Sequence, residues 1–426
     1  MLFFQSDGRH FSSLLDDASF LLISRFAGKA LLFVFLIVLA KRLNKGEFLD
    51  LEVISSLFNF LIWLFLAVTF SISRIGSSFP VLEVDKYLRV LLKRTLPATI
   101  TLGGLILTIF LVSGLLYNQT SGSVTVDLVL IVSAFALLQF LFSYILGFHQ
   151  ARESYRFIGV LYLVPGLVAV VPAGLFLFLD LGLLEALMVY LLGAICQLLL
   201  AYIGLHSTIL KSPATGVTDI PKKLYPGLIR ISLGLSIFFV IHSMDIFSAK
   251  FLLDQASGET YARLEFLGRI LFTIVATVGF VAFVRFVRAY EDEKPFGSIV
   301  RSFSSSKMLV GLGTMIGIFL CAPFLYTGLF SDDATALLPV MFMVLSAKTI
   351  QSILFIVVTF KGATVSRYVL RWLVVTLGLQ VFLFATFHDD ISDVARNILI
   401  SAVVATALFC YSFLRERRAA VTHAKQ

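Results

Sequence analysis

Residues 227–252 read GLIRISLGLSIFFVIHSMDIFSAKFL, and this stretch decides the class of the fold. It is long enough to cross a bilayer as a helix, because a span needs about 20 mostly apolar residues. It also holds an acidic side chain, Asp245, inside the apolar run. A charge at mid-bilayer depth costs at least ~2.5–3.5 kcal/mol unless it faces a wet cavity or a partner. The stretch therefore predicts a membrane-spanning helix that meets a polar environment.

The rest of the chain repeats this apolar pattern. Of the 426 residues, 59% are hydrophobic and only 14% are charged, whereas soluble domains have roughly 25% charged residues. We predict an all-α polytopic membrane protein. Twelve spans are expected, at roughly 17–41, 51–73, 97–117, 126–147, 157–179, 183–205, 227–252, 262–285, 308–330, 337–360, 368–387 and 394–414.

Lysine and arginine set the expected orientation of these spans. They gather in alternate connections, and the opposite connections favour acids, so the positive-inside rule places both termini in the cytoplasm. The cluster Lys41, Arg42 and Lys45 breaks this pattern locally. The formal net charge of +8 forms no single stripe, so we expect no nucleic-acid partner. The outer connections are short, and even the longest cytoplasmic ones, at about 206–226 and 286–307, are too short to fold into a soluble domain. Any function is therefore expected inside the helical bundle.

Arg25 and Lys29 are the first candidate functional residues. They are four residues apart in the first span and share one helix face. Two like charges repel there unless an anion or water lies opposite. The alternative is that both side chains snorkel to the cytoplasmic interface.

The second half of the chain holds the remaining candidates. Glu265 and Arg269 are four residues apart, in an order that favours an ion pair, which leaves a purely structural pair as one alternative. Arg263 precedes them, nearer the outer surface. Lys348 lies in the polar stretch VLSAKTIQS, which predicts a cavity-facing surface or, alternatively, hydrogen bonds between helices. With Asp245, these intramembrane charges are predominantly positive and favour a water-filled cationic cavity for anionic cargo.

Catalytic and metal-binding motifs are not apparent. The sequence has no GxxxxGK[ST] phosphate loop, no GxSxG elbow and no HExxH pair. Its three cysteines lie in apolar spans without a CxxC spacing. We expect no catalytic residue, no metal site and no cofactor, and the sequence leaves open whether a coupling ion, H⁺ or Na⁺, is used.

Three stretches resemble a known superfamily. They are LLISRFAGKALLFVFLIVLAKRLNKGEFLDLEVISSLFNFL (21–61), SISRIGSS (71–78) and HSMDIFSAKFLLDQASGETYARLEFLGRI (242–270). They are similar to the helix 1–turn–helix 2 segment, the end of helix 2 and the helix 7–helix 8 passage of the multidrug/oligosaccharidyl-lipid/polysaccharide exporter superfamily. Within it, the chain looks most like the Wzx-type polysaccharide (O-antigen) flippases. The turn after the first span lacks the Gly-Pro common in that group.

The resemblance implies a fold and a function. It implies two six-helix lobes, residues 1–215 with helices 1–6 and residues 216–426 with helices 7–12, around a central cavity. Members flip a lipid-linked oligosaccharide, here expected to carry polyprenyl pyrophosphate, by alternating access across the bacterial cytoplasmic membrane. Substrate-binding residues are expected to be Arg25, Lys29, Arg263, Arg269 and Lys348. Asp245 and Glu265 are expected to act as a coupling site or salt-bridge switch. The expectation for Lys348 is based only on its polar surroundings.

Partners follow from the same resemblance. They are the lipid-linked oligosaccharide, membrane lipids, and a glycan polymerase with other proteins of lipopolysaccharide and O-antigen assembly; the chain itself is expected to be a monomer. A drug/cation antiporter of the same superfamily is the first alternative, although it would need a cavity dominated by acids. A membrane-embedded glycan polymerase or ligase would need a sizeable outer loop. A structural or lipid-sensing protein is the remaining alternative.

Overall fold

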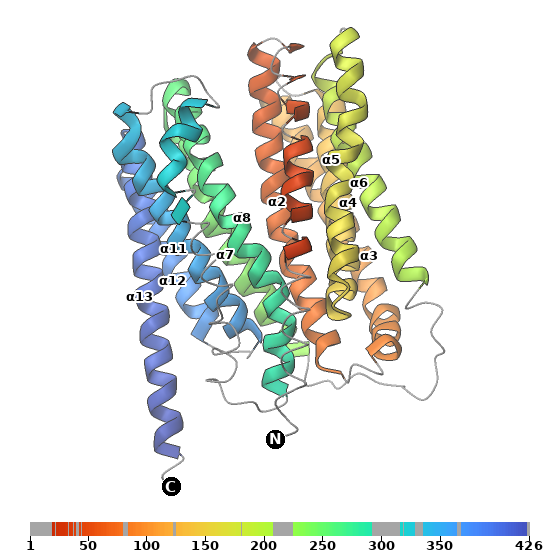
Figure 1. The fold of residues 1–426 in the computed structure, drawn as a ribbon, viewed down its shortest axis with the longest axis vertical. Helices are drawn as coiled ribbons and strands as arrows, with labels where there is room; N and C mark the ends of the chain where they lie inside the picture. The colour runs from red at the N-terminus through yellow and green to blue at the C-terminus, as the bar shows by residue number, and fades with distance from the viewer. Residues whose placement is uncertain are drawn as a thin grey trace. The chain divides into compact units, whose positions relative to one another are not determined.

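The computed structural model describes most of the chain, and every regular element in the described part is a helix (Figure 1). The described residues are 19–21, 23–32, 34–36, 38–39, 42–43, 45–79, 84–121, 125–179, 181–207, 225–291, 316–317, 319–328, 335–363 and 368–423. The all-α class predicted from the sequence is confirmed.

Eleven helices in these ranges are long and apolar enough to cross a membrane. They cover Ser19–Leu36, Leu57–Ser77, Val84–Leu115, Val126–Ala151, Tyr155–Phe178, Leu183–Leu205, Ile231–Leu252, Gln255–Val284, Thr335–Lys361, Val369–Thr386 and Ile391–Ser412. A shorter apolar helix, Phe319–Gly328, lies within the expected ninth span at 308–330, of which only part is described. The chain is a multi-pass membrane protein.

The chain divides into two compact units, residues 1–228 and 229–426. The predicted lobe boundary, between residues 215 and 216, lies outside the described residues. The turn after the first span is shorter than predicted, because α2 already begins at Lys45 and takes in the Gly46-Glu47-Phe48 segment.

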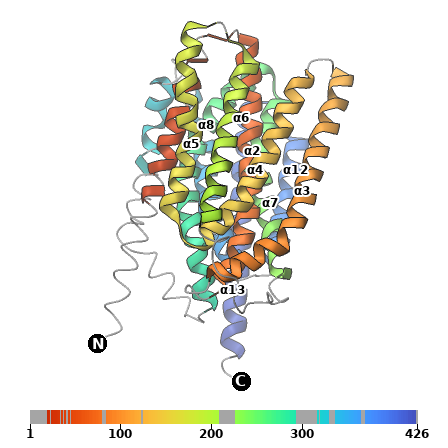
Figure 2. The same ribbon diagram turned by 90° about the vertical axis from the view of Figure 1, so that its right-hand side faces the viewer.

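The first unit is a bundle in which α4 is the central helix. Its helices after the first span are α2 (Lys45–Ser77), α3 (Val84–Ser121), α4 (Val126–Ala151), α5 (Tyr155–Phe178) and α6 (Leu183–Leu205). Helix α4 packs against α2, α3 and α6, and α3 lies at the edge of this unit (Figure 2). Leu105, Ile109 and Val112 of α3 are exposed, as expected for side chains that face lipid.

Aromatic side chains fill the core of this unit. The rings of Phe58 on α2 and Phe135 on α4 stack with centroids 3.8 Å apart. Phe35 of the first span meets Phe176 of α5 edge to face at 5.6 Å. Such pairs contribute about 0.5–1.5 kcal/mol beyond their area burial, so they help to fix which helices are neighbours.

The first span and α5 cross at two glycines. A Cβ added to Gly166 would lie 2.4 Å from the carbonyl oxygen of Gly28, and one added to Gly28 would lie 2.3 Å from that of Tyr162. Only glycine fits such a backbone contact, which is typical of membrane helix pairs. This crossing sets the position of the first span, and hence of Arg25, against α5.

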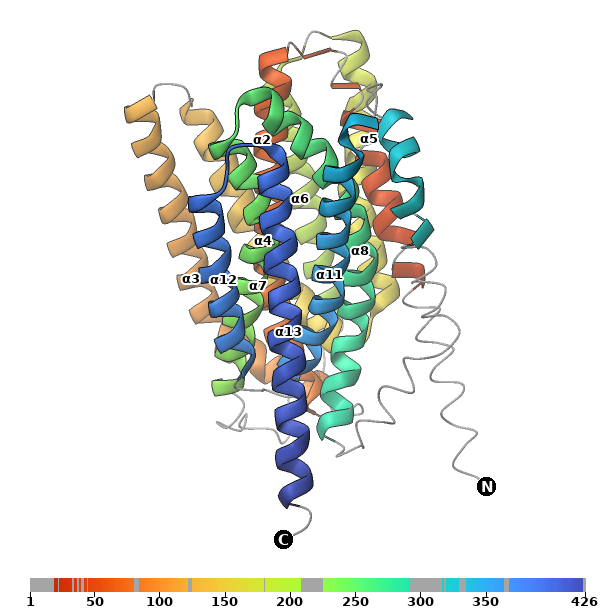
Figure 3. The same ribbon diagram turned by 90° about the vertical axis from the view of Figure 1, so that its left-hand side faces the viewer.

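The second unit is built around α11. Its elements are α7 (Tyr225–Leu252), α8 (Gln255–Glu291), the helix at 319–328, the 3₁₀ turn η3 (Thr335–Leu337), α11 (Leu338–Ala363), α12 (Tyr368–Thr386) and α13 (Ile391–His423). Helix α11 packs between α8 and α13, and α12 packs on α13 (Figure 3).

The turn from α7 to α8 is closed by Asp254. Its carboxylate accepts backbone N–H groups of Ala256 at 3.1 Å and Ser257 at 3.2 Å, at the start of α8. Hydrogen bonds from the side chain and backbone of Ser257 lower the pKa of Asp254. An acid in this position satisfies helix N–H groups that lack intrahelical acceptors, so α8 starts directly after α7 ends.

The glycine crossing can be tested by Gly166→Ala. We expect the added methyl group to lower the free energy of unfolding by about 1–3 kcal/mol, because neither backbone can give way. Gly174→Ala in the same helix is the matched control, since a Cβ there meets nothing within 4 Å; it should be neutral or slightly stabilising. Thermal unfolding in detergent micelles measures both, and equal stability of the two variants would contradict the crossing.

Candidate functional site

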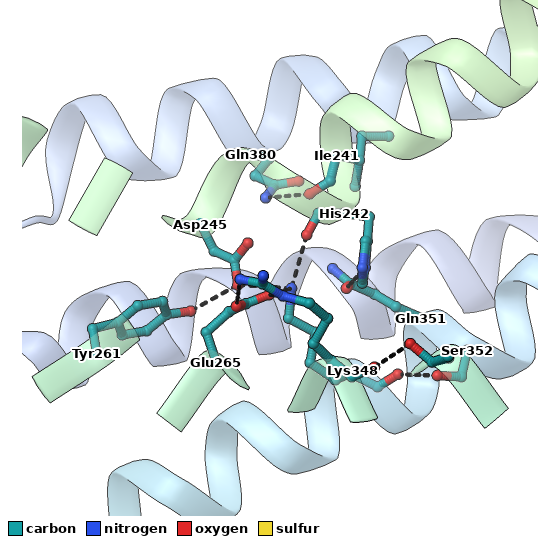
Figure 4. A network of polar contacts seen from close by, with 11 residues as sticks. Ile241, His242, Asp245, Tyr261, Glu265, Lys348, Gln351, Ser352 and Gln380 are labelled. Carbon is teal, nitrogen blue, oxygen red and sulfur yellow. Dashed lines mark hydrogen bonds and ion pairs between the residues drawn. The ribbon is translucent and has the colours of Figure 1, made fainter. Parts of the chain in front are cut away.

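The second unit contains a buried ion pair between two helices. The Lys348 ammonium of α11 lies 2.8 Å from Oδ2 of Asp245 on α7, and both side chains are 0% exposed. The same ammonium donates a hydrogen bond to the carbonyl oxygen of His242 at 2.8 Å. Figure 4 shows these groups converging between α7, α8 and α11. The two predicted site residues that are farthest apart in this half of the sequence are thus in direct contact.

Glu265 extends the pair into an alternating row of charges. Its Oε1 lies 3.7 Å from the Lys348 ammonium, and its carboxylate forms an ion pair with Arg269, one turn later on α8. The Glu265–Arg269 pair predicted from their spacing is confirmed. We call Asp245, Lys348, Glu265 and Arg269 the charge cluster; it holds two carboxylates and two cations and is formally neutral.

Neutrality explains how these groups can be buried. An isolated ion in a low-dielectric interior costs several kcal/mol, and mutual attraction with hydrogen bonds offsets much of this cost. Tyr261 supplies one such bond, donating its hydroxyl to Asp245 Oδ2 at 2.9 Å. A tight approach of α8 to α11 adds packing: a Cβ on Gly268 would lie 2.7 Å from Cγ of Lys348.

A second layer of polar groups borders the charge cluster. Nδ1 of His242 lies 2.9 Å from Gln351 Oε1 on α11, and the His242 ring stacks on Phe272 at 3.8 Å. Gln380 of α12 donates its amide to the carbonyl oxygen of Ile241 at 3.1 Å. Helices α7, α8, α11 and α12 therefore each contribute a polar group to one buried region.

The polar stretch around Lys348 is buried. Lys348 and Ser352 are 0% exposed and Gln351 is 1% exposed. Of the two interpretations of this stretch, hydrogen bonding between helices describes the structure, and the prediction of an open, cavity-facing Lys348 is wrong for this conformation. The physical reason is that Asp245 and Glu265 supply enough negative charge to hold the ammonium inside the unit.

Arg263 lies on a different face of α8 from Glu265 of the charge cluster. It lies two residues before Glu265 on α8 and is half-buried. Residues two apart on a helix do not share a face. Arg263 and Glu265 therefore point to different sides of α8.

Arg25 and Lys29 lie in the first unit, where other groups orient them. Arg25 is 8% exposed, and its guanidinium lies 4.3 Å from the centre of the Tyr162 ring on α5. The exposed Lys29 donates to Oδ1 of Asn59 on α2 at 2.9 Å. Although they share a helix face, the first packs on α5 and the second reaches α2.

Sequence reasoning missed Tyr261 and Gln380. Tyr261 precedes Glu265 by one helical turn, so its position on the same face of α8 was a usable signal. Gln380 is a polar residue inside an apolar span, which by itself points to an interior role. The carbonyl of His242 could not have been found from the sequence, because any residue has one.

Comparisons with known proteins identify the fold. No protein-family model matches the chain, and no curated protein matches it in sequence. Among solved structures, it is similar to a multidrug resistance MATE family transporter of the MOP superfamily in its outward-facing conformation, with a TM-score of 0.73 and 14% identity over 94% of this chain and 95% of that one. A MATE in the straight conformation gives a TM-score of 0.69 and 14% identity over 95% of this chain and 96% of that one.

A third solved structure also shares the fold of this chain. It is a MOP superfamily transporter from Pyrococcus furiosus, with a TM-score of 0.69 and 13% identity over 94% of this chain and 95% of that one. Identities this low show the fold alone. The chain thus has the fold of MATE-type transporters of the MOP superfamily.

Removing the buried ammonium tests the charge cluster. We expect Lys348→Met to lower the free energy of unfolding by about 3–5 kcal/mol, because it leaves Asp245 as an uncompensated buried charge. The double variant Lys348→Met/Asp245→Asn should recover most of this loss. Thermal unfolding in micelles measures both variants.

The matched control is Lys250→Met, which changes an exposed lysine in the last turn of the same partner helix, α7. It should alter stability by no more than about 0.5 kcal/mol. A double variant as unstable as Lys348→Met would show that the two side chains are not energetically coupled.

Proposed function

We propose that the chain is a transporter that flips a lipid-linked oligosaccharide across the bacterial cytoplasmic membrane by alternating access. Its fold, that of MATE-type transporters, supports the transporter class. The anionic part of the cargo is a polyprenyl pyrophosphate. The observation that carries this proposal is Arg25, a permanently charged side chain buried within an apolar span and oriented on an aromatic ring.

The chemistry of the first span suits a phosphate group. A guanidinium presents a rigid fork of donors that matches phosphate oxygens, and stacking on Tyr162 fixes its plane. Lys29 adds a mobile point charge one turn along the same helix. Ionisable side chains within a membrane-spanning helix are by default candidates for a functional site.

The cations of the second unit differ in how accessible they are to a substrate. The Arg269 side chain is 22% exposed, so it can reach a head group directly, and Arg263 on the same helix is half-buried. Lys348 reaches the substrate only when its pairs with Asp245 and Glu265 open. In this proposal the charge cluster is the salt-bridge switch, and rearrangement of its pairs accompanies the change between the two access states.

A drug/cation antiporter is the second candidate function. It is favoured by the solved structure of a multidrug resistance transporter with this fold. Against it stand the cations of the first span, which repel organic cations. The transporter from Pyrococcus furiosus has been described as having a binding pocket of reverse polarity that suggests a different function. A change of pocket charge within this fold therefore has a precedent.

The proposed setting follows from the charge pattern and from the substrate. The positive-inside rule places both termini in the cytoplasm, and the flipped glycan passes to a polymerase and other assembly proteins on the outer side. The transporter itself acts as a monomer.

Complementation tests the proposed function. In a strain that lacks its own flippase, we expect the wild type to restore surface glycan. Arg25→Gln and Lys29→Gln should each reduce it at least tenfold at equal membrane expression, because each removes a charge that binds phosphate. Arg156→Gln is the matched control, since Arg156 is an exposed arginine at the start of α5.

Two results would contradict the proposal. Full restoration by the Arg25 and Lys29 variants would make those cations structural. Absence of restoration by the wild type, together with increased resistance of the same cells to cationic drugs, would favour the antiporter.

A further inference from the structure

We propose that the start of α12 and the end of the α13 span form a binding site for an anionic phospholipid of the bilayer, whose phosphate lies on the guanidinium of Arg371. The site consists of Arg371 and Trp372 of α12 and Tyr411 of α13, and we call these three residues the head-group site. It lies wholly within the second unit, and it requires no assumption about the transported cargo.

Two neighbouring helices of the second unit present an apolar face to lipid. Helix α12 packs against α13, and the two run side by side in Figure 3. On α12 the side chains of Val374, Val375 and Phe382 are exposed and recur at helical spacing. On α13, Ile400 and Val403 are exposed. Exposed apolar side chains of membrane-spanning helices face the hydrocarbon chains of lipids.

Arg371 lies at one end of this apolar face. It precedes Val374 by three residues and Val375 by four, so it shares their side of α12. Its side chain is exposed, and it falls in the first turn of the apolar span Val369–Thr386. A long cationic side chain in the first turn of a span reaches the level of the lipid head groups.

The head-group site offers hydrogen-bond donors but no partner for them in the described part of the chain. The Arg371 guanidinium lies 5.4 Å from the centre of the Trp372 ring, and it makes neither an ion pair nor a hydrogen bond with any described residue. The buried indole Nε1 of Trp372 has no acceptor among the described residues either. Donors without acceptors favour an anion, and the planar fork of a guanidinium matches phosphate oxygens.

Two aromatic rings mark the level of the head-group site. Trp372 meets Tyr411 of α13 edge to face, with ring centroids 6.4 Å apart. Tyr411 is the next-to-last residue of the span Ile391–Ser412 and is 56% exposed. Trp and Tyr are typical of the level at which head groups meet the hydrocarbon. A phosphate beside Arg371 therefore leaves the acyl chains along the apolar face of α12 and α13.

Charge selects an anionic lipid as the occupant. A zwitterionic head group carries an ammonium that offsets its phosphate, whereas phosphatidylglycerol carries no such cation. Basic side chains at helix ends on the cytoplasmic side attract anionic lipids, and the proposed orientation puts the start of α12 on that side. A second copy of the chain would have to bury Arg371, and the described residues at this end of the face offer no carboxylate to pair with it.

Native mass spectrometry tests the head-group site, because it counts bound molecules and identifies them by mass. Purified full-length protein in a neutral detergent is titrated with phosphatidylglycerol or with phosphatidylcholine. We expect the wild type to bind the first phosphatidylglycerol more tightly than the first phosphatidylcholine. Arg371→Gln should lower this preference about fivefold, which is the attraction expected of one basic side chain at an anionic membrane surface.

Arg156→Gln is the matched control, since it removes the same charge from an exposed arginine in the first turn of α5. It should leave the preference unchanged. Trp372→Phe keeps a ring beside the guanidinium and should retain most of the preference. Trp372→Leu removes the ring and should lower the preference about two- to fivefold.

Three results would overturn the proposal. The first is a wild type without preference for phosphatidylglycerol. The second is an equal loss in Arg156→Gln and Arg371→Gln, which would mean that net charge alone attracts the lipid. The third is a bound mass of a second copy of the chain or of a polyprenyl pyrophosphate that Arg371→Gln removes in place of phosphatidylglycerol. Glycan complementation has no bearing on these measurements, so the two proposals can fail separately.

Discussion

The buried ammonium of Lys348 is the constraint on which the second unit depends. An ammonium with 0% exposure persists only with a carboxylate at close range, and the unit provides Asp245 at 2.8 Å and Glu265 at 3.7 Å. These groups come from three helices, α7, α8 and α11. Their helical register is therefore fixed by charge as well as by apolar packing. Tyr261 donates a hydrogen bond to Asp245, and the carbonyl of His242 accepts one from Lys348. These hydrogen bonds fix the orientation of the Asp245–Lys348 pair as well as its distance.

The first unit also contains a buried cation, which lies against an aromatic ring. Its buried cation, Arg25, lies on the ring of Tyr162, and the close crossing of Gly28 and Gly166 brings the two helices near enough for that contact. A glycine contact between backbones thus determines where a charge is held. In the first unit a glycine crossing positions the cation on an aromatic face, and in the second unit carboxylates surround it in a formally neutral cluster.

The fold constrains the function only in part. Solved structures that share this fold over almost the whole chain can have only 12–15% identity with it, a level at which architecture persists while side chains in the site diverge. The features that remain specific to each chain are then the sign and placement of a few intramembrane charges. In this chain those charges are Arg25 and Lys29 in the first unit and the formally neutral charge cluster in the second.

The sequence by itself determined the helices and the class of protein, because an apolar run of about 20 residues is a local property that the hydrocarbon thickness imposes. It also determined the Glu265–Arg269 pair, since residues one turn apart on a helix are neighbours in any fold. Only the tertiary structure decided that Lys348 is enclosed by Asp245 and Glu265, and that Tyr261 and Gln380 join them. Those contacts depend on which helices pack together and on their rotation, and these are set by many weak side-chain contacts between distant segments rather than by any local pattern.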